Sequence, residues 1–382
     1  MSGMDRRSFV TAMGQSAALL CAGLSPKEAH AQQISRGGTA ANKKIRRIGV
    51  EEHIGWQEYN SYVTSLHMTG TPPPPAGVAQ GGPPSGGTSG KAPVGTTSVV
   101  NTNATDALGD VTGIDARLKK MDEAGITMQV LSWRNPGVDK FETAVGIEWA
   151  KKINNKLSEI VHQYPERFSA FSSIPWQDPE AAVAELERAV KDLGLKGIKI
   201  DGTVKGEYLD SKRFWPIFKK AEELNTPIFI HVEDPRPAMV KFYSEFTTTD
   251  VMDFARDLDV CFHSARLINS GLFDEYPGLK IVLGHMGEAL PFLPKRFTGG
   301  ASRKKSAEEY IKENFYFSIS GNIYMPAFTC CYEAVGADHI LFGVDFPAGS
   351  CAEAVDFMES AQISQNDREK IYHLNAEKLF SL

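Results

Sequence analysis

The sequence predicts an α/β fold, specifically a (β/α)8 or TIM barrel. Eight short apolar segments of strand character occur along the chain, and each is followed by a helical pattern or a loop. Strict alternation of this kind gives parallel strands covered by helices, and eight such units are the number that closes a barrel. An open doubly wound sheet is the alternative. No glycine-rich dinucleotide fingerprint follows the first strand, which counts against that version.

The strands are predicted from short apolar runs bounded by turn residues, and the helices from a 3.6-residue apolar period. Glycines at positions 125 and 194 end two of the helices, as expected for a residue that adopts positive φ without cost. The predicted strands span residues 46–53, 126–132, 167–175, 197–201, 227–232, 280–285, 315–320 and 340–346. The predicted helices span residues 114–124, 141–163, 179–193, 211–224, 254–271, 305–313, 326–335, 351–361 and 365–379.

The N-terminal part of the chain has the features of an export signal rather than of a folded domain. Residues 5–10 read Asp-Arg-Arg-Ser-Phe-Val, a modestly apolar run follows, and Ala-His-Ala at 29–31 offers a cleavage site. We therefore predict a twin-arginine-like signal over 1–31, a polar tether over 32–45, and a periplasmic protein. No later stretch has the length of a membrane span, so we expect no membrane contact in the mature form.

Residues 46–382 are predicted to form one barrel domain interrupted by a segment rich in Pro and Gly at about 69–105. Such a composition does not build a regular core element. A loop after the first strand of a barrel lies on the active-site face. The segment is expected to cap the pocket, to mediate subunit contact, or to be a disordered insertion.

The net charge of the 382 residues is −6, and no basic surface pattern is evident outside the N-terminus. Nucleic-acid binders carry a basic footprint, so this class is excluded. A small-molecule substrate is the expected partner.

Metal-binding side chains stand at the ends of four predicted strands. Glu51 and His53 are two apart on the first strand, so both leave the same face, and Glu52 points the other way. The fifth, sixth and eighth strands end in His231, His285 and Asp345. The carboxyl ends of barrel strands meet at one rim, where barrel enzymes place their active sites. Imidazoles and carboxylates together suit one Zn²⁺ or Mn²⁺ ion.

Ordered motifs then indicate a family. The sequence has Glu-x-His at 51–53, Ile-His at 230–231, Gly-His-Met-Gly-Glu at 284–288 and Gly-Val-Asp-Phe-Pro at 343–347. In these motifs the chain resembles the amidohydrolase superfamily, whose fold is a barrel of the metal-dependent hydrolase type. Within it the chain is similar to the decarboxylase branch, which includes γ-resorcylate, 2,3-dihydroxybenzoate, 5-carboxyvanillate and aminocarboxymuconate semialdehyde decarboxylases. The resemblance covers roughly residues 46–382 apart from the Pro/Gly-rich segment.

The resemblance implies a role for each motif residue. The implied metal ligands are Glu51, His53, His231 and Asp345. Asp345 is also the implied acid, and His285 with Glu288 the implied proton-relay or substrate-holding pair. The two-metal hydrolases of the superfamily use a carboxylated lysine on strand four, for which only Lys199 is available here, and we expect one metal.

The expected activity is decarboxylation of an ortho-hydroxybenzoate-like acid without oxidation. The same residues suit activation of water, so a hydrolase acting on a lactone, ester or amide is the alternative. A non-catalytic periplasmic binding protein is a third hypothesis. Departures from the family pattern place Trp133, Arg134 and Arg236 near the expected pocket, and we predict that they contact substrate. Relatives are commonly dimers or tetramers, so a homo-oligomer is expected.

Overall fold

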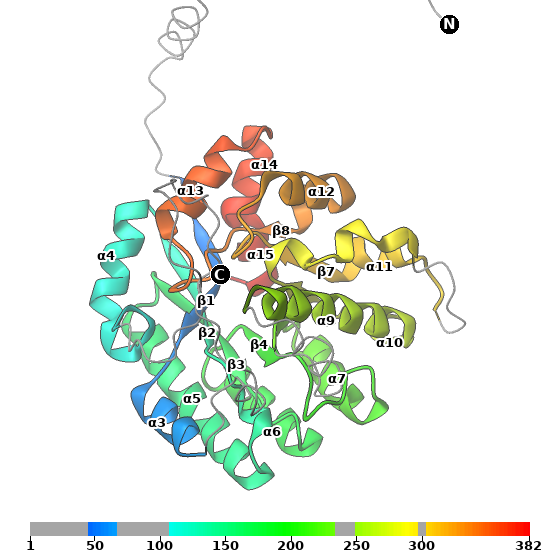
Figure 1. The fold of residues 1–382 in the computed structure, drawn as a ribbon. Coiled ribbons are helices and arrows are strands. Elements are labelled where there is room, and N and C mark those ends of the chain that lie inside the picture. The colour runs from blue at the N-terminus through cyan, green and yellow to red at the C-terminus, as the bar shows by residue number, and fades with distance from the viewer. Residues whose placement is uncertain (1–44, 67–106, 234–248, 297–302) are drawn as a thin grey trace, which may run out of the picture. The chain divides into compact units, whose positions relative to one another are not determined.

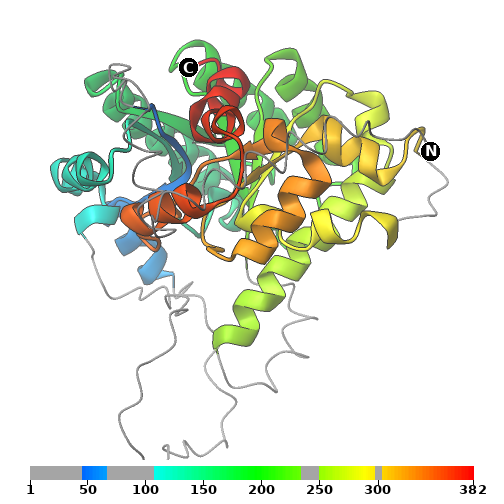
Figure 2. The same cartoon turned by 90° about the horizontal axis from the view of Figure 1, so that it is seen from above.

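Eight parallel strands follow one another around the sheet in sequence order, from β1 to β8, and helices surround them (Figures 1 and 2). This computed structural model describes residues 45–66, 107–233, 249–296 and 303–382. The predicted (β/α)8 barrel is confirmed. The predicted signal, the tether as far as residue 44 and the segment at 69–105 lie outside the described residues, as does Arg236. Residues Arg46–Leu382 form one compact unit.

Each predicted strand is present, with small differences at the ends. The strands are β1 Ile48–Ile54, β2 Met128–Trp133, β3 Phe168–Ser173, β4 Gly197–Asp201, β5 Ile228–His231, β6 Ile281–Leu283, β7 Phe315–Ser318 and β8 Ile340–Leu341. The eighth is shorter than the predicted 340–346. The extended chain after it still closes the barrel, because the Val50 amide donates to the Phe342 carbonyl (2.8 Å) and the Asp345 amide donates to the Glu51 carbonyl (3.0 Å).

The helices also follow the prediction closely. They are α3 Gln57–Ser65, α4 Ile114–Ala124, α5 Thr143–Gln163, α6 Pro179–Lys191, α7 Trp215–Glu223, α9 Thr249–Asn269, α10 Leu272–Glu275, α11 Ala307–Asn314, α12 Met325–Val335, α13 Cys351–Ser360, α14 Gln365–Glu369 and α15 Asn375–Phe380. Helix α3 was not predicted. The last predicted helix is divided by a π-helical turn at Lys370–Leu374, which separates α14 from α15. No described helix has both the length and the apolar character that crossing a membrane requires.

Apolar side chains from the strands fill the barrel interior. This core includes Ile48, Val50, Met128, Val130, Phe171, Phe229, Val282, Tyr316 and Leu341, each less than one-tenth exposed. Helix α15 closes one end of the barrel, where the Phe380 ring packs edge-on against Phe171 at 5.4 Å between centroids. Arg46, just before β1, pairs with Glu377 of α15 at 2.6 Å, so this is the end at which β1 begins. The opposite end is therefore left for the polar residues that end the strands.

Candidate metal centre

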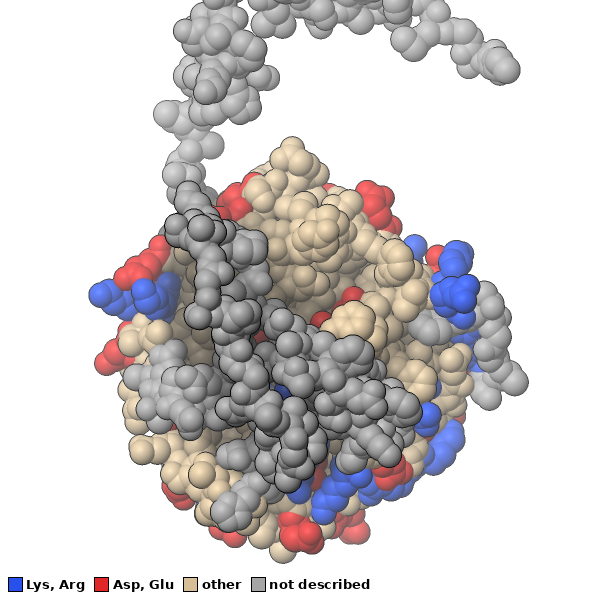
Figure 3. Space-filling view, in the orientation of Figure 1, with Lys and Arg blue, Asp and Glu red and all other residues tan. Residues whose placement is uncertain are grey.

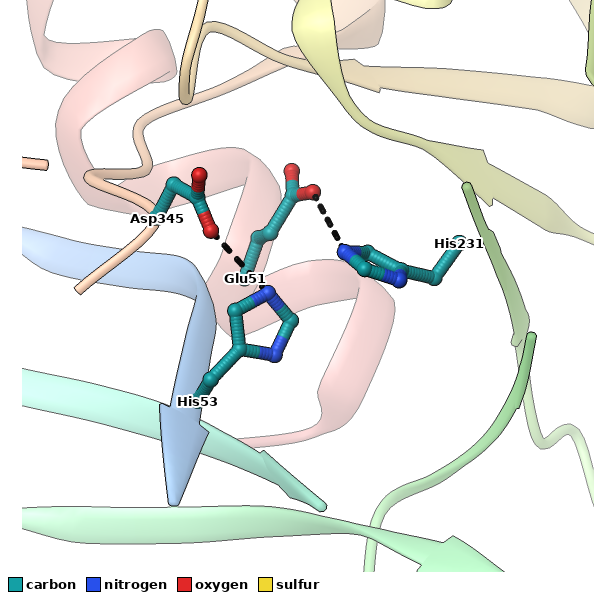
Figure 4. A group of neighbouring side chains, drawn as sticks. All are labelled: Glu51, His53, His231 and Asp345. Carbon is teal, nitrogen blue, oxygen red and sulfur yellow. Dashed lines mark ion pairs between the residues drawn. The ribbon is translucent and has the colours of Figure 1, made fainter. Parts of the chain in front are cut away.

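Four polar side chains from distant parts of the chain meet at the carboxyl end of the barrel (Figure 4). Glu51 and His53 come from β1, His231 from the end of β5, and Asp345 from the segment after β8. Each offers one ligand atom, and these atoms lie within 4.8 Å of one another. His53 Nε2 is 3.0 Å from Asp345 Oδ1, and His231 Nε2 is 3.8 Å from Glu51 Oε1. The structure thus brings together the four residues that were predicted from the sequence as metal ligands.

A β-bulge in β1 turns Glu51 toward this cluster. Ile48 and Val50 point into the barrel core, so uninterrupted alternation would send Glu52 inward as well. The pairing with β2 instead shifts between Val50 and Glu52, and Glu51 adopts a φ of 83°. The extra residue reverses the alternation, and Glu51 and His53 face the site. Gly284 permits this approach, because a Cβ there would lie 2.4 Å from Glu51 Oε1.

The bulge leaves Glu52 outside the cluster, as predicted from its position between two ligands. Its carboxylate accepts hydrogen bonds from the Gln129 side chain (2.9 Å) and from the Val344 amide (3.1 Å). Gln129 in turn accepts a hydrogen bond from Arg117 of α4 at 3.0 Å. Burial raises the pKa of Glu52 well above its usual value. Glu52 therefore ties β1 to β2 and to the chain after β8.

Replacing Glu52 with alanine should destabilise the fold. Two buried donors, on Gln129 and Val344, would lose their acceptor, and each unsatisfied donor costs about 1–3 kcal/mol. We expect a loss of roughly 3 kcal/mol in the free energy of unfolding, measured by urea titration of the metal-free protein. Glu58→Ala, on α3, is the matched control because Glu58 is exposed. Equal stability of the two variants would contradict this role for Glu52.

The two histidines of the cluster are each held through Nδ1. His53 Nδ1 is 2.8 Å from the Ser132 hydroxyl, and His231 Nδ1 is 3.1 Å from Asp201 Oδ1. Both rings therefore direct Nε2 into the cluster. Burial lowers the pKa of His53, and burial together with the charge of Lys199 lowers the pKa of His231 to about 3. Both imidazoles are consequently neutral at pH 7, which is the form that binds metals.

The pKa values of the two carboxylates in the cluster are shifted in opposite directions. Burial raises the pKa of Glu51 to about 7, although His285 and the Ser320 hydroxyl, which donates to Glu51 Oε2, act against this shift. Burial also opposes ionisation of Asp345, but its hydrogen bond and charge interaction with His53 lower its pKa. Asp345 is therefore ionised at neutral pH, while Glu51 is buried without a full complement of donors.

The donor set fits one divalent cation. Among the described residues, Glu51 Oε1 is buried and has no hydrogen-bond partner, and His53 Nε2 contacts only the Asp345 carboxylate within the cluster. A buried acceptor without a donor is costly, and a cation is what two carboxylates and two neutral imidazoles lack. Lys199 is not free to bridge a second ion, because its ammonium donates to the Trp133 carbonyl and to Asn135 Oδ1, both at 2.8 Å, and pairs with Asp201 at 2.5 Å.

His285 and Glu288 lie beside the four-residue cluster. His285 Nδ1 is 2.9 Å from Glu288 Oε1, and its Nε2 is 3.6 Å from Glu51 Oε1. Burial lowers the pKa of His285, but the charge of Glu288 outweighs this and raises it well above the usual value. The predicted pair is thus formed, with His285 as a cation. A Cβ at Gly321 would lie 2.8 Å from His285 Nε2 and 3.5 Å from Asp345 Oδ2, so both groups border the same small space.

Sequence reasoning missed four polar residues around the site. Ser132 and Asp201 hold the two histidines, Ser320 contacts Glu51, and Asp257 of α9 lies 3.8 Å from His285 Nδ1. Ser132, Asp201 and Ser320 were at or near the ends of predicted strands, the same signal that identified the ligands. Asp257 lies within a helix, where no sequence pattern distinguishes it.

The three predicted substrate-binding residues have different outcomes. Trp133 is 2% exposed, and its ring packs edge-on against Tyr59 at 5.6 Å. Ser132 faces His53, so its neighbour Trp133 leaves the opposite face of β2. This position argues against substrate contact by the Trp133 ring. Arg134 is half-buried at the end of β2 and remains a candidate, while Arg236 lies outside the described residues.

The surroundings of this end of the barrel are mixed in charge. Acidic side chains are visible near the centre of the face drawn in Figure 3, next to uncharged surface. Basic side chains are concentrated toward the edge of the described surface in this view.

A barrel with a mixed nitrogen and oxygen cluster at its carboxyl end defines a class of metal-dependent enzymes. The Amidohydrolase family model matches residues 68–382. The chain therefore belongs to the amidohydrolase superfamily.

Its relatives place it in the decarboxylase branch. The chain is 36% identical to a gamma-resorcylate decarboxylase from Polaromonas sp. (strain JS666) over 284 residues, which is 70% of this chain and 87% of the relative. It is 35% identical to a gamma-resorcylate decarboxylase from Rhizobium sp. (strain MTP-10005), with the same coverage. A dihydroxybenzoic acid decarboxylase from Polaromonas sp. JS666, solved with bound manganese and the inhibitor 2-nitroresorcinol, superposes with a TM-score of 0.73 and 30% identity, covering 88% of this chain and 97% of that one.

Proposed function

We propose that the protein is a metal-dependent, non-oxidative decarboxylase of a hydroxylated benzoate that carries a hydroxyl group ortho to the carboxylate. The observation that carries this proposal is the convergence of Glu51, His53, His231 and Asp345 in a relative of gamma-resorcylate decarboxylases. These four residues would hold one metal ion. Mn²⁺ is proposed over Zn²⁺, because half of the donors are carboxylate oxygens and a related structure contains manganese.

When bound, the ion supplies a Lewis acid that orients the substrate's oxygens and stabilises negative charge. Residues of the chain supply the proton that the reaction requires. Loss of CO₂ leaves an electron pair on the ring carbon, and one proton must replace the carboxylate there. Asp345 delivers that proton to the carbon. Because Asp345 is ionised at rest, it must first take up a proton, and His285, held by Glu288, borders the same space and is placed to relay a proton from the substrate's phenol.

Incubation of the purified, manganese-loaded protein with 2,6-dihydroxybenzoate tests the proposal. We expect release of CO₂ and formation of resorcinol, which chromatography detects. Both should be lost when the ion is removed. Panels of lactones, esters and amides address the hydrolase alternative. Cleavage of any of these, with no decarboxylation of any hydroxybenzoate, would refute the decarboxylase assignment. Ligand binding without turnover of any compound would indicate a binding protein instead.

We further propose that Arg134 contacts the substrate. A Cβ at Gly109 would lie 3.2 Å from Arg134 Nη1 and 2.8 Å from Pro347 Cγ, so the guanidinium extends toward the chain that follows Asp345. Arg134 makes no ion pair with any residue in the described part of the chain. Its charge is therefore available to an anionic substrate.

Replacing Arg134 with glutamine should raise the KM for the hydroxybenzoate. Charge-assisted hydrogen bonds contribute about 1.5–3 kcal/mol, so a rise on the order of 10- to 100-fold is expected with a smaller change in kcat. Steady-state kinetics measure both constants. Arg167→Gln is the matched control, because Arg167 pairs with Asp122 at 2.7 Å, outside the site. An unchanged KM would remove Arg134 from the substrate site.

Export and assembly complete the proposal. The Arg-Arg motif and small-residue site before residue 32 support a periplasmic location. A twin-arginine route carries folded proteins, so the ion could be loaded before export. Cell fractionation after replacing Arg6 and Arg7 with lysine tests the location, and we expect the variant to be retained in the cytoplasm.

We also propose that the protein is a homo-oligomer, and light scattering of the purified protein would reveal a monomer if this is wrong.

A further inference from the structure

Asp201, the last residue of β4, touches a proposed metal ligand without belonging to the ligand set. Its Oδ1 lies 3.1 Å from His231 Nδ1, and the carboxylate is buried, at 1% exposure for the residue. His231 Nε2, on the other side of the ring, faces Glu51 Oε1 at 3.8 Å. A carboxylate that accepts the Nδ1 proton leaves the Nε2 lone pair directed into the cluster.

Lys199 fixes the Asp201 carboxylate in turn. The ammonium has three donors, and three acceptors surround it: Asp201 Oδ1 at 2.5 Å, with the Trp133 carbonyl and Asn135 Oδ1 at 2.8 Å. Trp133 ends β2 and Asn135 lies just after it, so Lys199 joins β4 to the end of β2 at this rim. Its charge also offsets that of Asp201, which would otherwise be an uncompensated buried anion.

The backbone of Asp201 is held as firmly as its side chain. Lys140, from the segment after β2, donates to the Asp201 carbonyl at 2.9 Å. The same ammonium pairs with Asp139 at 2.8 Å and with Glu233 at 2.7 Å. Glu233 lies two residues after His231. Lys140 therefore links the chain after β5 to the end of β4, on either side of the contact between Asp201 and His231.

We propose that Asp201, anchored by Lys199 and Lys140, is a positioning residue that presets His231 for metal binding. It holds the Nδ1 proton, fixes the rotation of the ring, and aims Nε2 at Glu51 before the ion arrives. Asp201 acts only through His231 and does not touch the reacting atoms. This inference rests on the ligand set of the proposed function and adds the group that makes one ligand rigid.

The contrast with His53 supports a specific role for Asp201. His53 Nδ1 meets the neutral hydroxyl of Ser132, whereas His231 Nδ1 meets a carboxylate that is paired with the buried ammonium of Lys199. Hydrogen bonds to charged groups are stronger than those between neutral groups. The arrangement at His231 is therefore the more rigid of the two, and its loss should weaken metal binding most.

Competition of the full-length protein with a fluorescent chelator for Mn²⁺ tests the inference, because it measures metal affinity without any assay of turnover. We expect Asp201→Ala to weaken Mn²⁺ binding by about 10- to 100-fold, the usual effect of removing such a partner. Asp201→Asn keeps an oxygen that accepts the His231 Nδ1 proton, so it should retain much of the affinity. Electron paramagnetic resonance of bound Mn²⁺ should show a broadened or altered signal in the alanine variant and not in the asparagine variant.

Glu185→Ala is the matched control. Glu185 of α6 is also a buried carboxylate, at 4% exposure, and it accepts hydrogen bonds from Arg188 (2.7 Å) and Asn154 (2.7 Å). Its removal should lower the Tm of the metal-free protein without changing the Mn²⁺ affinity of the folded fraction. A merely structural role for Asp201 would give the same behaviour as Glu185.

The outcomes separate this inference from the proposed function. Wild-type affinity in both folded Asp201 variants would overturn the positioning role while leaving the ligand set intact. A wild-type protein that binds no Mn²⁺ would overturn the ligand set, and the positioning role with it. Weakened binding in Asp201→Ala, partly restored in Asp201→Asn and absent from the control, supports the inference.

Discussion

Replacing Asp345 with asparagine is expected to reduce kcat/KM for hydroxybenzoate decarboxylation by at least about 10³-fold. Positioned proton donors contribute roughly 10²- to 10⁴-fold, and this variant also loses a carboxylate from the proposed ligand set. Asparagine has nearly the same shape, so the interaction lost is chiefly that between the charged oxygen and His53 Nε2, which are 3.0 Å apart. Initial rates of CO₂ release with saturating Mn²⁺ measure the effect, and saturation separates lost chemistry from weaker metal binding.

The fold of this variant should be preserved, which circular dichroism and the Tm of the metal-free protein would verify. Asp338→Asn is the matched control. Asp338 has a side chain that is 67% exposed and pairs with Lys370 outside the site, so its replacement should leave the rate unchanged. A rate within tenfold of the wild type in a folded, metal-loaded Asp345→Asn variant would refute the proposed delivery of the proton.

Removal of the metal ion should abolish activity and lower stability together. The cluster contains a fully buried Glu51 whose Oε1 has no hydrogen-bond partner among the described residues, so removal of the ion would leave a buried acceptor unsatisfied. An ion that binds only the folded state stabilises it by about 2.7 kcal/mol when its concentration is one hundred times Kd. Dialysis against a chelator should therefore reduce decarboxylation to background and lower the Tm, and added Mn²⁺ should restore both.

The identity of the ion is tested in the same experiment. Zn²⁺ and Mn²⁺ are added separately to the metal-free protein, and the rate is compared at equal occupancy. The proposal expects a higher rate with Mn²⁺. Addition of Mg²⁺ is the control for a nonspecific effect of divalent charge. Full activity in a protein shown by elemental analysis to hold no metal would contradict the role of the cluster.

Much of this architecture could be predicted because its signals are local. Short apolar runs alternating with helical patterns define eight strands, and a barrel is the closed form of that repeat. The positions of His231, His285 and Asp345 at the ends of such runs were enough to place them on one rim. The pairing of His285 with Glu288 likewise follows from a spacing of three residues.

Other features depend on contacts between distant segments. A bulge belongs to a pair of strands, so the sequence of β1 alone does not reveal that its alternation reverses at Glu51. The prediction that Glu51 and His53 share a face was sound, but which face they share is decided by the pairing with β2 and by the space at Gly284. The position of Trp133 has the same origin, since Ser132 rather than Trp133 meets His53.

By itself, the sequence determined the barrel and the set of polar residues at its rim, because strand length, apolar pattern and strand-end position are properties of adjacent residues. Only the tertiary structure decided how the side chains of those residues are oriented. Asp201 and Ser132 orient the histidines, and Asp257 reaches His285 from a helix. These contacts join residues far apart in the chain, and burial gives them their effect, because a polar group out of water takes its orientation and its pKa from the few partners that surround it.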